Sequence, residues 1–280
     1  MRNAIIGFLF FWIILSLGLL IFLTVKVCSL QSQIDKITKT NDSVSYDTND
    51  EINYGATAYA TDDEDNIAGL EDTLKVYLTF DDGPSENTDK ILDILDDYGV
   101  KATFFVQGKT DSKSKDRMKR IVDEGHTIGM HTYSHSYGRI YESLESFSED
   151  VTKIGNLIYD ATGVDTIFYR FPGGSSNTIA GSKIGDYISY LNDNDIVYVD
   201  WNVASGDAAS PELSVDAIVE NVMSDVVRYK TSIVLLHDSD TKGNTLKALP
   251  ILIEKLRGAD AVILPIDSET SLIQHVTLDH

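Results

Sequence analysis

The sequence predicts an α/β fold, a deformed parallel β/α barrel of about seven strands preceded by one transmembrane helix. The barrel is predicted because short apolar runs alternate with amphipathic stretches after Thr73, and alternating strands and helices form parallel sheets. In addition, most of these runs end at or shortly before an aspartate, arginine or histidine, and barrel enzymes carry their chemistry at the carboxyl ends of strands. The transmembrane helix is predicted from about 22 residues without charge near the N-terminus.

The 280 residues divide into four predicted parts. A short tail at 1–3 precedes the transmembrane anchor at 4–25, a juxtamembrane segment and acidic flexible tether follow at 26–72, and one catalytic-sized domain occupies 73–280. An uncleaved anchor is favoured over a signal peptide because no small-residue cleavage site follows the apolar run. The tether is too polar and acidic to bury the apolar surface that an ordered fold needs. The charges beside the anchor do not decide its orientation.

Within the domain, seven apolar runs have the length of strands, and helical patterns fill most of the gaps. The predicted strands are 74–80, 102–106, 127–131, 166–171, 195–200, 232–236 and 261–265. The clearest predicted helices are 86–98, 143–161, 214–227 and 245–256. Either Ser85 or Asn87 can cap the first helix, because both side chains accept hydrogen bonds from free backbone N–H groups.

The charge balance limits the class of partner. Asp and Glu outnumber Lys and Arg by 44 to 23, which gives a formal net charge of −21. This argues against a nucleic-acid partner, because phosphate binding needs clusters of basic residues and none stands out. We expect a neutral or cationic partner. The single cysteine, Cys28, excludes a disulfide within one chain.

Two short motifs can carry chemistry. Asp81 and Asp82 end the first predicted strand and point in different directions if the backbone stays extended, so one can bind a metal while the other faces a substrate. His131 and His135 lie on one face if their segment is helical, and this spacing suits a zinc-like ion. The glutamate of the His-Glu-x-x-His metalloprotease motif is absent, which disfavours a peptidase. Considered alone, the Asp81-Asp82 motif is also typical of a solvated turn, and His131 and His135 are also typical of surface histidines.

Together these motifs resemble a known family. Thr79-Phe80-Asp81-Asp82-Gly83 and His131-Thr132-Tyr133-Ser134-His135 are similar to the first two motifs of the polysaccharide deacetylases of carbohydrate esterase family 4, also called the NodB homology domain. The resemblance covers about residues 75–265, and the order and spacing of the motifs make it specific. It implies that Asp82, His131 and His135 bind one divalent metal ion, usually zinc, with cobalt or another divalent ion as alternatives. Asp81 would then be the general base.

The segment Arg170-Phe171-Pro172-Gly173-Gly174 resembles the third family motif. The resemblance implies that Arg170 contacts the catalytic aspartate and that the loop, with Pro172 and Gly173, contacts the substrate. The backbone N–H at position 173 would help to hold the oxyanion. Gly173 stands where the family has Tyr or Phe, so the aromatic wall of the sugar site is expected to differ.

The last two motifs lie further along the chain. The segment from Trp201 to Ala208 resembles the fourth, with Trp201 implied as a substrate contact and Asp207 as the residue that orients a catalytic histidine. Ala208 replaces a family tryptophan, which predicts a wider pocket. Leu235-Leu236-His237-Asp238 is similar to the fifth, in which Leu235 lines the acetyl pocket and His237 protonates the leaving amine.

The implied function is metal-dependent removal of N-acetyl groups from the amino sugars of a polysaccharide. A membrane anchor and tether favour a polymer beside the membrane, hence peptidoglycan N-acetylglucosamine, with the domain outside the cell on a single-pass anchor in the cell membrane. One alternative is an esterase for O-acetyl xylan or another acetylated sugar. Another is an inactive, tethered wall-binding module, because a fold does not fix a function. The sequence predicts no oligomeric state.

Overall fold

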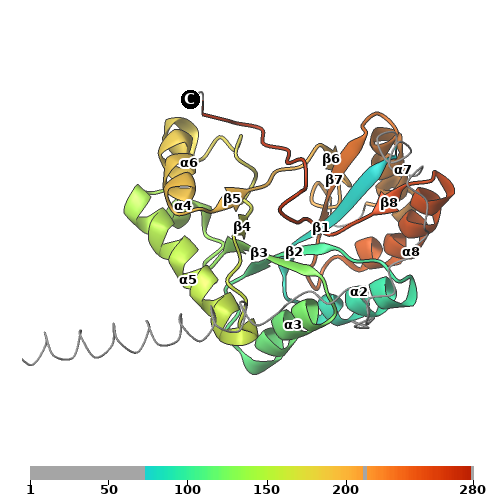
Figure 1. Ribbon diagram of the computed structural model, residues 1–280, viewed down its shortest axis with the longest axis horizontal. Helices are drawn as coiled ribbons and strands as arrows, with labels where there is room; N and C mark the ends of the chain where they lie inside the picture. Colours follow the sequence, from blue (N-terminus) through green and yellow to red (C-terminus); the bar gives the residue numbers. More distant parts are fainter. Residues whose placement is uncertain (1–72, 211–212, 279–280) are drawn as a thin grey trace, which may run out of the picture. The chain divides into compact units, whose positions relative to one another are not determined.

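A parallel sheet of eight strands lies at the centre of the computed structural model, which describes residues 73–210 and 213–278 (Figure 1). Seven strands are ordered β5-β4-β3-β2-β1-β7-β6, and β8 pairs with β1 beside this path. The strands are β1 (Lys75–Gly83), β2 (Thr103–Gln107), β3 (Thr127–Thr132), β4 (Phe168–Tyr169), β5 (Val197–Tyr198), β6 (Val203–Ala204), β7 (Thr231–His237) and β8 (Val262–Ile263). Every pairing is parallel, which confirms the predicted α/β class.

The sheet curls because the strands at its two ends, β5 and β6, follow one another in the sequence. Only four residues, 199–202, separate β5 from β6, yet β5 pairs with β4 while β6 pairs with β7. The sheet is therefore a curled, incomplete barrel, consistent with the predicted deformed β/α barrel. The predicted anchor at 4–25 and tether at 26–72 lie outside the described residues. Among the helices that the structure describes, none is long and apolar enough to span a membrane.

Helices cover the outer side of the sheet (Figure 1). They are α2 (Glu86–Asp97), α3 (Ser112–Asp123), α4 (Tyr137–Ile140), α5 (Leu144–Thr162), the 3-10 turn η2 (Gly181–Lys183), α6 (Ile184–Asp193), α7 (Val215–Val226) and α8 (Gly243–Gly258). Ser85, rather than Asn87, caps α2 by accepting a hydrogen bond from the Asn87 N–H. Ser143 and Ser214, predicted as first helical residues, are the N-caps of α5 and α7.

Strand β1 shows how the sequence builds both sides of the sheet. Its even-numbered residues from Val76 to Phe80 belong to the large core shared with the helices, and Tyr77 belongs to a smaller cluster inside the barrel. Both sets are buried, as expected for a parallel sheet covered on both faces. The inward row continues to Asp81, which is 3% exposed. Asp82 then leaves the extended conformation with a φ of 74°. The strand therefore delivers two carboxylates in different directions.

Several predicted strands are shorter than expected. The runs 166–171 and 195–200 contain only the two-residue strands β4 and β5. Single backbone hydrogen bonds continue beyond them, since the Arg170 N–H donates to the Met130 carbonyl and the Val199 N–H donates to the Tyr169 carbonyl. Before β5, Asp195 has a left-handed φ of 56°, which extended strands do not adopt. The run 261–265 contains β8, which pairs only with the first two residues of β1 because β2 occupies that edge from Thr79 onward. Strand β6 was not predicted, since two residues carry no periodicity.

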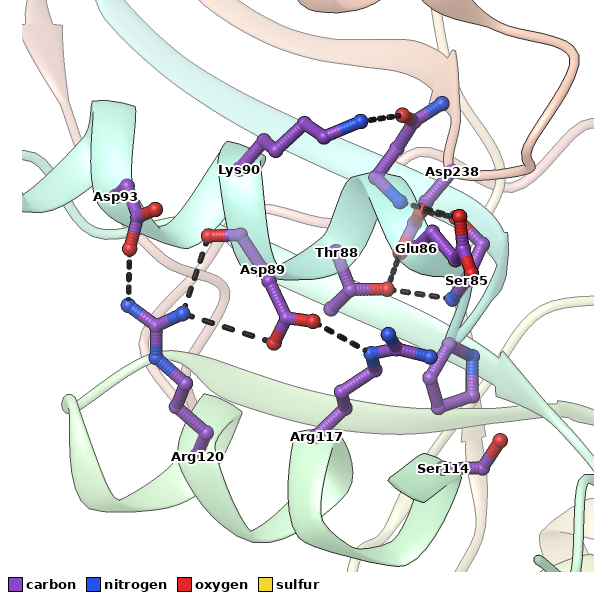
Figure 2. Close-up of polar contacts among 12 residues, drawn as sticks. Ser85, Glu86, Thr88, Asp89, Lys90, Asp93, Ser114, Arg117, Arg120 and Asp238 are labelled. Carbon is purple, nitrogen blue, oxygen red and sulfur yellow. Dashed lines mark hydrogen bonds and ion pairs between the residues drawn. The ribbon is translucent and has the colours of Figure 1, made fainter.

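Two kinds of polar contact surround α2 (Figure 2). On its outer side, Arg117 and Arg120 of α3 form ion pairs with Asp89 and Asp93, which are partly exposed and therefore contribute at most about 1 kcal/mol each. At its N-terminus, fully buried Asp238 accepts hydrogen bonds from the hydroxyls of the first helical turn and its cap. The backbone N–H of Asp238 donates to the Asp81 carbonyl over 2.6 Å. This contact fixes the turn that follows β1.

The packing face of α5 contains one buried carboxylate among apolar residues. Asp150 is 6% exposed. It accepts hydrogen bonds from the Thr132 hydroxyl over 2.7 Å and from the backbone N–H groups of Tyr133 and Ser134 over 2.7 and 3.0 Å. One side chain therefore holds the loop that follows β3.

We predict that Asp150→Ala lowers the free energy of unfolding by about 3 kcal/mol, because it leaves the buried Thr132 hydroxyl and two partly buried backbone N–H groups without their acceptor. Urea unfolding of the full chain measures this change. The matched control is Glu149→Ala on the same helix, whose exposed side chain contacts only Lys153 and which should leave the unfolding midpoint nearly unchanged. Equal midpoints for the two variants would contradict the role given to Asp150.

Candidate active site

Three possible metal ligands meet at the carboxyl ends of β1 and β3. Asp82 follows the extended part of β1, His131 lies near the end of β3, and His135 lies in the loop after it. Their ligand atoms all lie within 4.8 Å of one another. Asp82 Oδ1 is 3.5 Å from Nε2 of His131 and 3.1 Å from Nε2 of His135. The structure thus brings together the three residues predicted to bind a metal.

Each ligand is held in a definite orientation. Nδ1 of His131 lies 2.8 Å from the Arg170 carbonyl, which can only accept a hydrogen bond, so Nδ1 carries the proton and Nε2 presents its lone pair to the cluster. The backbone N–H of His135, at a left-handed φ of 48°, donates to the Thr132 hydroxyl. Gln107 at the end of β2 donates to Asp82 Oδ1 over 2.8 Å.

The protonation states also suit a cation. Burial lowers the pKa of His131, despite the opposing charges of nearby aspartates, and this favours the neutral imidazole that a metal requires. Burial alone would raise the pKa of Asp82, but the His135 hydrogen bond and the neighbouring imidazoles outweigh it and hold the pKa well below its usual value. Two imidazole nitrogens and one carboxylate fit a divalent ion such as zinc and leave positions open for other ligands.

Beside this cluster, Asp81 is paired with a buried arginine. Nη1 of Arg170 lies 2.9 Å from Asp81 Oδ1 and 2.5 Å from the Thr79 hydroxyl oxygen. Arg170 is 0% exposed, and its Nε and Nη2 also donate hydrogen bonds to the backbone carbonyls of Val199 and Asp200. A buried guanidinium is tolerated only when its donors are satisfied in this way.

The barrel interior is shaped to accept the arginine. The guanidinium carbon lies 4.2 Å from the centre of the Phe105 ring. That ring in turn lies over Gly129, where an added Cβ would be only 2.6 Å from it. A glycine on β3 therefore allows Phe105 to pack flat beneath Arg170. Trp201 borders the other side, with its ring centre 5.8 Å from the guanidinium carbon.

On the opposite side of Asp81, strand β7 supplies His237. Asp81 and His237 are register partners on neighbouring parallel strands. Nδ1 of His237 lies 2.7 Å from Asp207 Oδ1, while Asp207 Oδ2 accepts hydrogen bonds from the His237 backbone N–H and the Thr245 hydroxyl. Burial by itself would lower the pKa of His237, but the hydrogen bond and charge of Asp207 outweigh it and raise the pKa. This pair favours an imidazolium whose Nε2 is a proton donor.

Asp200, the other aspartate near the fourth motif, has a different environment. It is fully buried and accepts hydrogen bonds from the N–H and hydroxyl of Ser175 and from the N–H of His275. Asp200 therefore joins the loop after β4 to the C-terminal segment. The carboxylate beside His237 is Asp207, as the sequence predicts.

The four residues predicted as substrate contacts surround this centre. Leu235 is half-buried on β7, in register with Thr79. The Pro172 carbonyl accepts a hydrogen bond from the Tyr141 hydroxyl, and Gly173 follows with a φ of 77°. Trp201 is half-buried and packs against the same loop. A Cβ added to Gly174 would lie 3.0 Å from the Trp201 ring.

Sequence reasoning missed three residues near the site. Gln107 could have been found, because it directly follows the predicted strand 102–106, and barrel enzymes carry their chemistry at the carboxyl ends of strands. Asp150 is a charged residue on the apolar stripe of a predicted helix, which is also a recognisable anomaly. His275 had no such indication: its ring lies 5.1 Å from that of Trp201, centre to centre, through contacts between segments distant in sequence.

Comparison with known proteins agrees with this geometry. A family model described as polysaccharide deacetylase matches residues 70–187. A putative polysaccharide deacetylase of Bacillus subtilis, YheN, is 34% identical over 65% of this chain, and the chain spans 63% of that protein's length. A peptidoglycan-N-acetylglucosamine deacetylase of Bacillus cereus is 33% identical over 73% of this chain and 72% of its own length.

A solved structure extends the likeness to three dimensions. The catalytic domain of a peptidoglycan N-acetylglucosamine deacetylase from Eubacterium rectale is 35% identical, with a TM-score of 0.69 over 74% of this chain and 94% of that one. The sequence motifs, the fold and these relatives lead to the same conclusion. The chain belongs to the polysaccharide deacetylase family, carbohydrate esterase family 4.

Proposed function

We propose that this protein is a metal-dependent hydrolase that removes N-acetyl groups from peptidoglycan N-acetylglucosamine. The observation that carries the proposal is the placement of Asp81 between the Asp82, His131 and His135 cluster and the register partner His237. A base, a cation site and an acid thus lie side by side at one end of the barrel. The similarity to peptidoglycan N-acetylglucosamine deacetylases supports this substrate.

Asp82, His131 and His135 would hold the divalent ion, which we propose to be zinc. When bound, the ion acts as a Lewis acid toward water and the acetyl carbonyl. Asp81 accepts the proton of the attacking water, and Arg170 holds its Oδ1 so that Oδ2 is the oxygen left for this task.

The remaining proposed steps use the backbone N–H of Gly173, the His237 imidazole and its partner Asp207. The backbone N–H of Gly173 donates to the carbonyl oxygen as negative charge develops on it. His237 donates the proton on Nε2 to the departing nitrogen, because its Nδ1 is bound to Asp207. The C–N bond breaks, and acetate and a free amine are released.

The placement of the enzyme is a further part of the proposal. The charge-free run at 4–25 supports a membrane anchor, and the polar stretch at 40–72 supports a tether of about 30 Å or more, by the scaling of flexible chains. An anchored domain outside the cell would work on the wall polymer next to the membrane. A sugar O-acetyl esterase would use the same catalytic groups, so substrate comparison must separate the two activities.

We expect the full chain to release acetate from peptidoglycan and from N-acetylglucosamine oligomers, and more slowly from acetylated xylan. Chelation should abolish the release without unfolding the domain, because all three proposed ligands belong to an ordered barrel, and added zinc or cobalt should restore it. An acetate assay with metal analysis and circular dichroism measures this. Full activity in verified metal-free protein would rule out the proposed mechanism, and faster release from xylan would favour the esterase.

Asp81→Asn and His237→Ala should each lower kcat by about 100-fold or more, because each removes one of the two proton-transfer groups. Metal content should stay near one ion per chain in both variants, since neither residue is a proposed ligand. Acetate-release kinetics with metal analysis test this. Near-normal kcat in one variant removes that residue from the mechanism. Wild-type protein that binds peptidoglycan without releasing acetate would instead indicate a wall-binding module.

Asp207→Asn should lower kcat by about tenfold or more and move the alkaline limb of the pH profile to lower pH. The proposed acid is protonated His237, so activity falls as pH rises through its pKa, and Asp207 raises that pKa. The control is Asp200→Asn, which removes a carboxylate bound to Ser175 and His275. The control should leave the alkaline limb in place. A shift of the alkaline limb in Asp200→Asn but not in Asp207→Asn would contradict the assignment of Asp207 as the partner of His237.

A further inference from the structure

The loop at Gly173 leaves space that a neighbouring side chain occupies. An added Cβ at Gly173 would lie 3.2 Å from Cε1 of Tyr137, 3.5 Å from its hydroxyl oxygen and 3.2 Å from Cβ of Asn177. Contacts this short are tighter than most side chains adopt, and the φ of 77° also disfavours any side chain there. Tyr137 of α4 therefore covers the position at which a residue-173 side chain would otherwise begin.

Tyr137 is the outermost member of a row of aromatic rings. Phe147 stacks on Tyr187 with 4.6 Å between ring centres, Tyr187 lies 5.7 Å from Tyr141, and Tyr141 lies 6.2 Å from Tyr137. Tyr137 then meets His135 edge to face at 5.6 Å. The row runs from the core to a proposed metal ligand, so the Tyr137 ring is supported from behind.

The hydroxyl groups of this row differ in what they bind. The Tyr141 hydroxyl donates to the Pro172 carbonyl, and the Tyr187 hydroxyl donates to the Tyr141 carbonyl, each over 2.9 Å. For Tyr137, which is half-buried, no hydroxyl hydrogen bond is present within residues 73–210 and 213–278. A rigid ring with an available hydroxyl at the edge of a reactive centre is suited to contact a ligand.

We propose that Tyr137 is a substrate-contacting residue that forms the wall of the sugar site beside Gly173, with its hydroxyl hydrogen-bonded to the N-acetylated sugar. The inference rests on the proposed function, because it assumes that an amino sugar occupies the site. The ring excludes water from one side of the acetamido group. The hydroxyl, which can donate and accept, selects a polar substituent of the sugar.

The test compares Tyr137→Phe and Tyr137→Ala with the wild-type full chain on N-acetylglucosamine oligomers. Loss of the hydroxyl alone should raise KM about 3- to 10-fold with a smaller change in kcat, the range of one lost hydrogen bond. Loss of the ring as well should lower kcat/KM about 10- to 100-fold. Metal content should stay near that of the wild type. Tyr159→Phe and Tyr159→Ala on α5, where Tyr159 is 57% exposed, are the matched controls and should leave both constants unchanged.

Calorimetric binding of the same oligomers separates this inference from the proposed function. Weaker binding by Tyr137→Phe supports the inference even if the wild type releases no acetate, an outcome that would overturn only the proposed reaction. Wild-type binding and kinetics in both Tyr137 variants would overturn the inference while leaving the reaction intact. The inference would also be overturned if the Tyr137 variants lost activity together with metal and excess zinc restored the activity. Tyr137 would then only support His135. A wild type that neither binds nor turns over the oligomers would overturn both.

Discussion

The candidate site depends on one buried cation, the guanidinium of Arg170. A charge inside the barrel is costly unless it is paired and hydrogen-bonded, and here the partners are a hydroxyl, a carboxylate and two backbone carbonyls. These bonds tie β1 to the segment that closes the sheet. The carbonyl of the same residue also fixes the tautomer of His131. One residue therefore orients both the proposed base and a proposed metal ligand.

The acid and the base occupy opposite electrostatic surroundings although they are register partners. Asp81 forms an ion pair with a permanent cation, Arg170, through one of its two carboxylate oxygens. His237 faces Asp207, which favours the imidazolium form that donates a proton. The difference follows from the side-chain partners of the two residues, because Arg170 directly follows β4 and Asp207 follows β6.

Much of this site could be predicted because it lies where strands end. Asp81, His131 and His237 each lie at or near the end of a run of buried residues. Because alternating strands and helices form a parallel sheet, the carboxyl ends of these strands were expected to meet at one end of the barrel. Other parts could not be predicted, since they depend on contacts between distant segments. Strand β6 is defined by its partner rather than by its own pattern, and the contact of Tyr137 with Gly173 appears only after the chain has folded.

Reactivity and substrate choice are carried by different parts of the fold. Asp81, Asp82, His131 and His237 project from strands, and His135 lies in the loop after β3. Hydrogen bonds to Arg170 and Asp207 hold three of these groups. The proposed walls around them come from helix α4, a loop and the C-terminal segment, with Tyr137, Trp201 and His275 on three separate stretches of chain. Loops tolerate substitution better than buried strands do. A glycine at 173 or an alanine at 208 can therefore reshape the sugar site while the residues that carry the reaction stay in place.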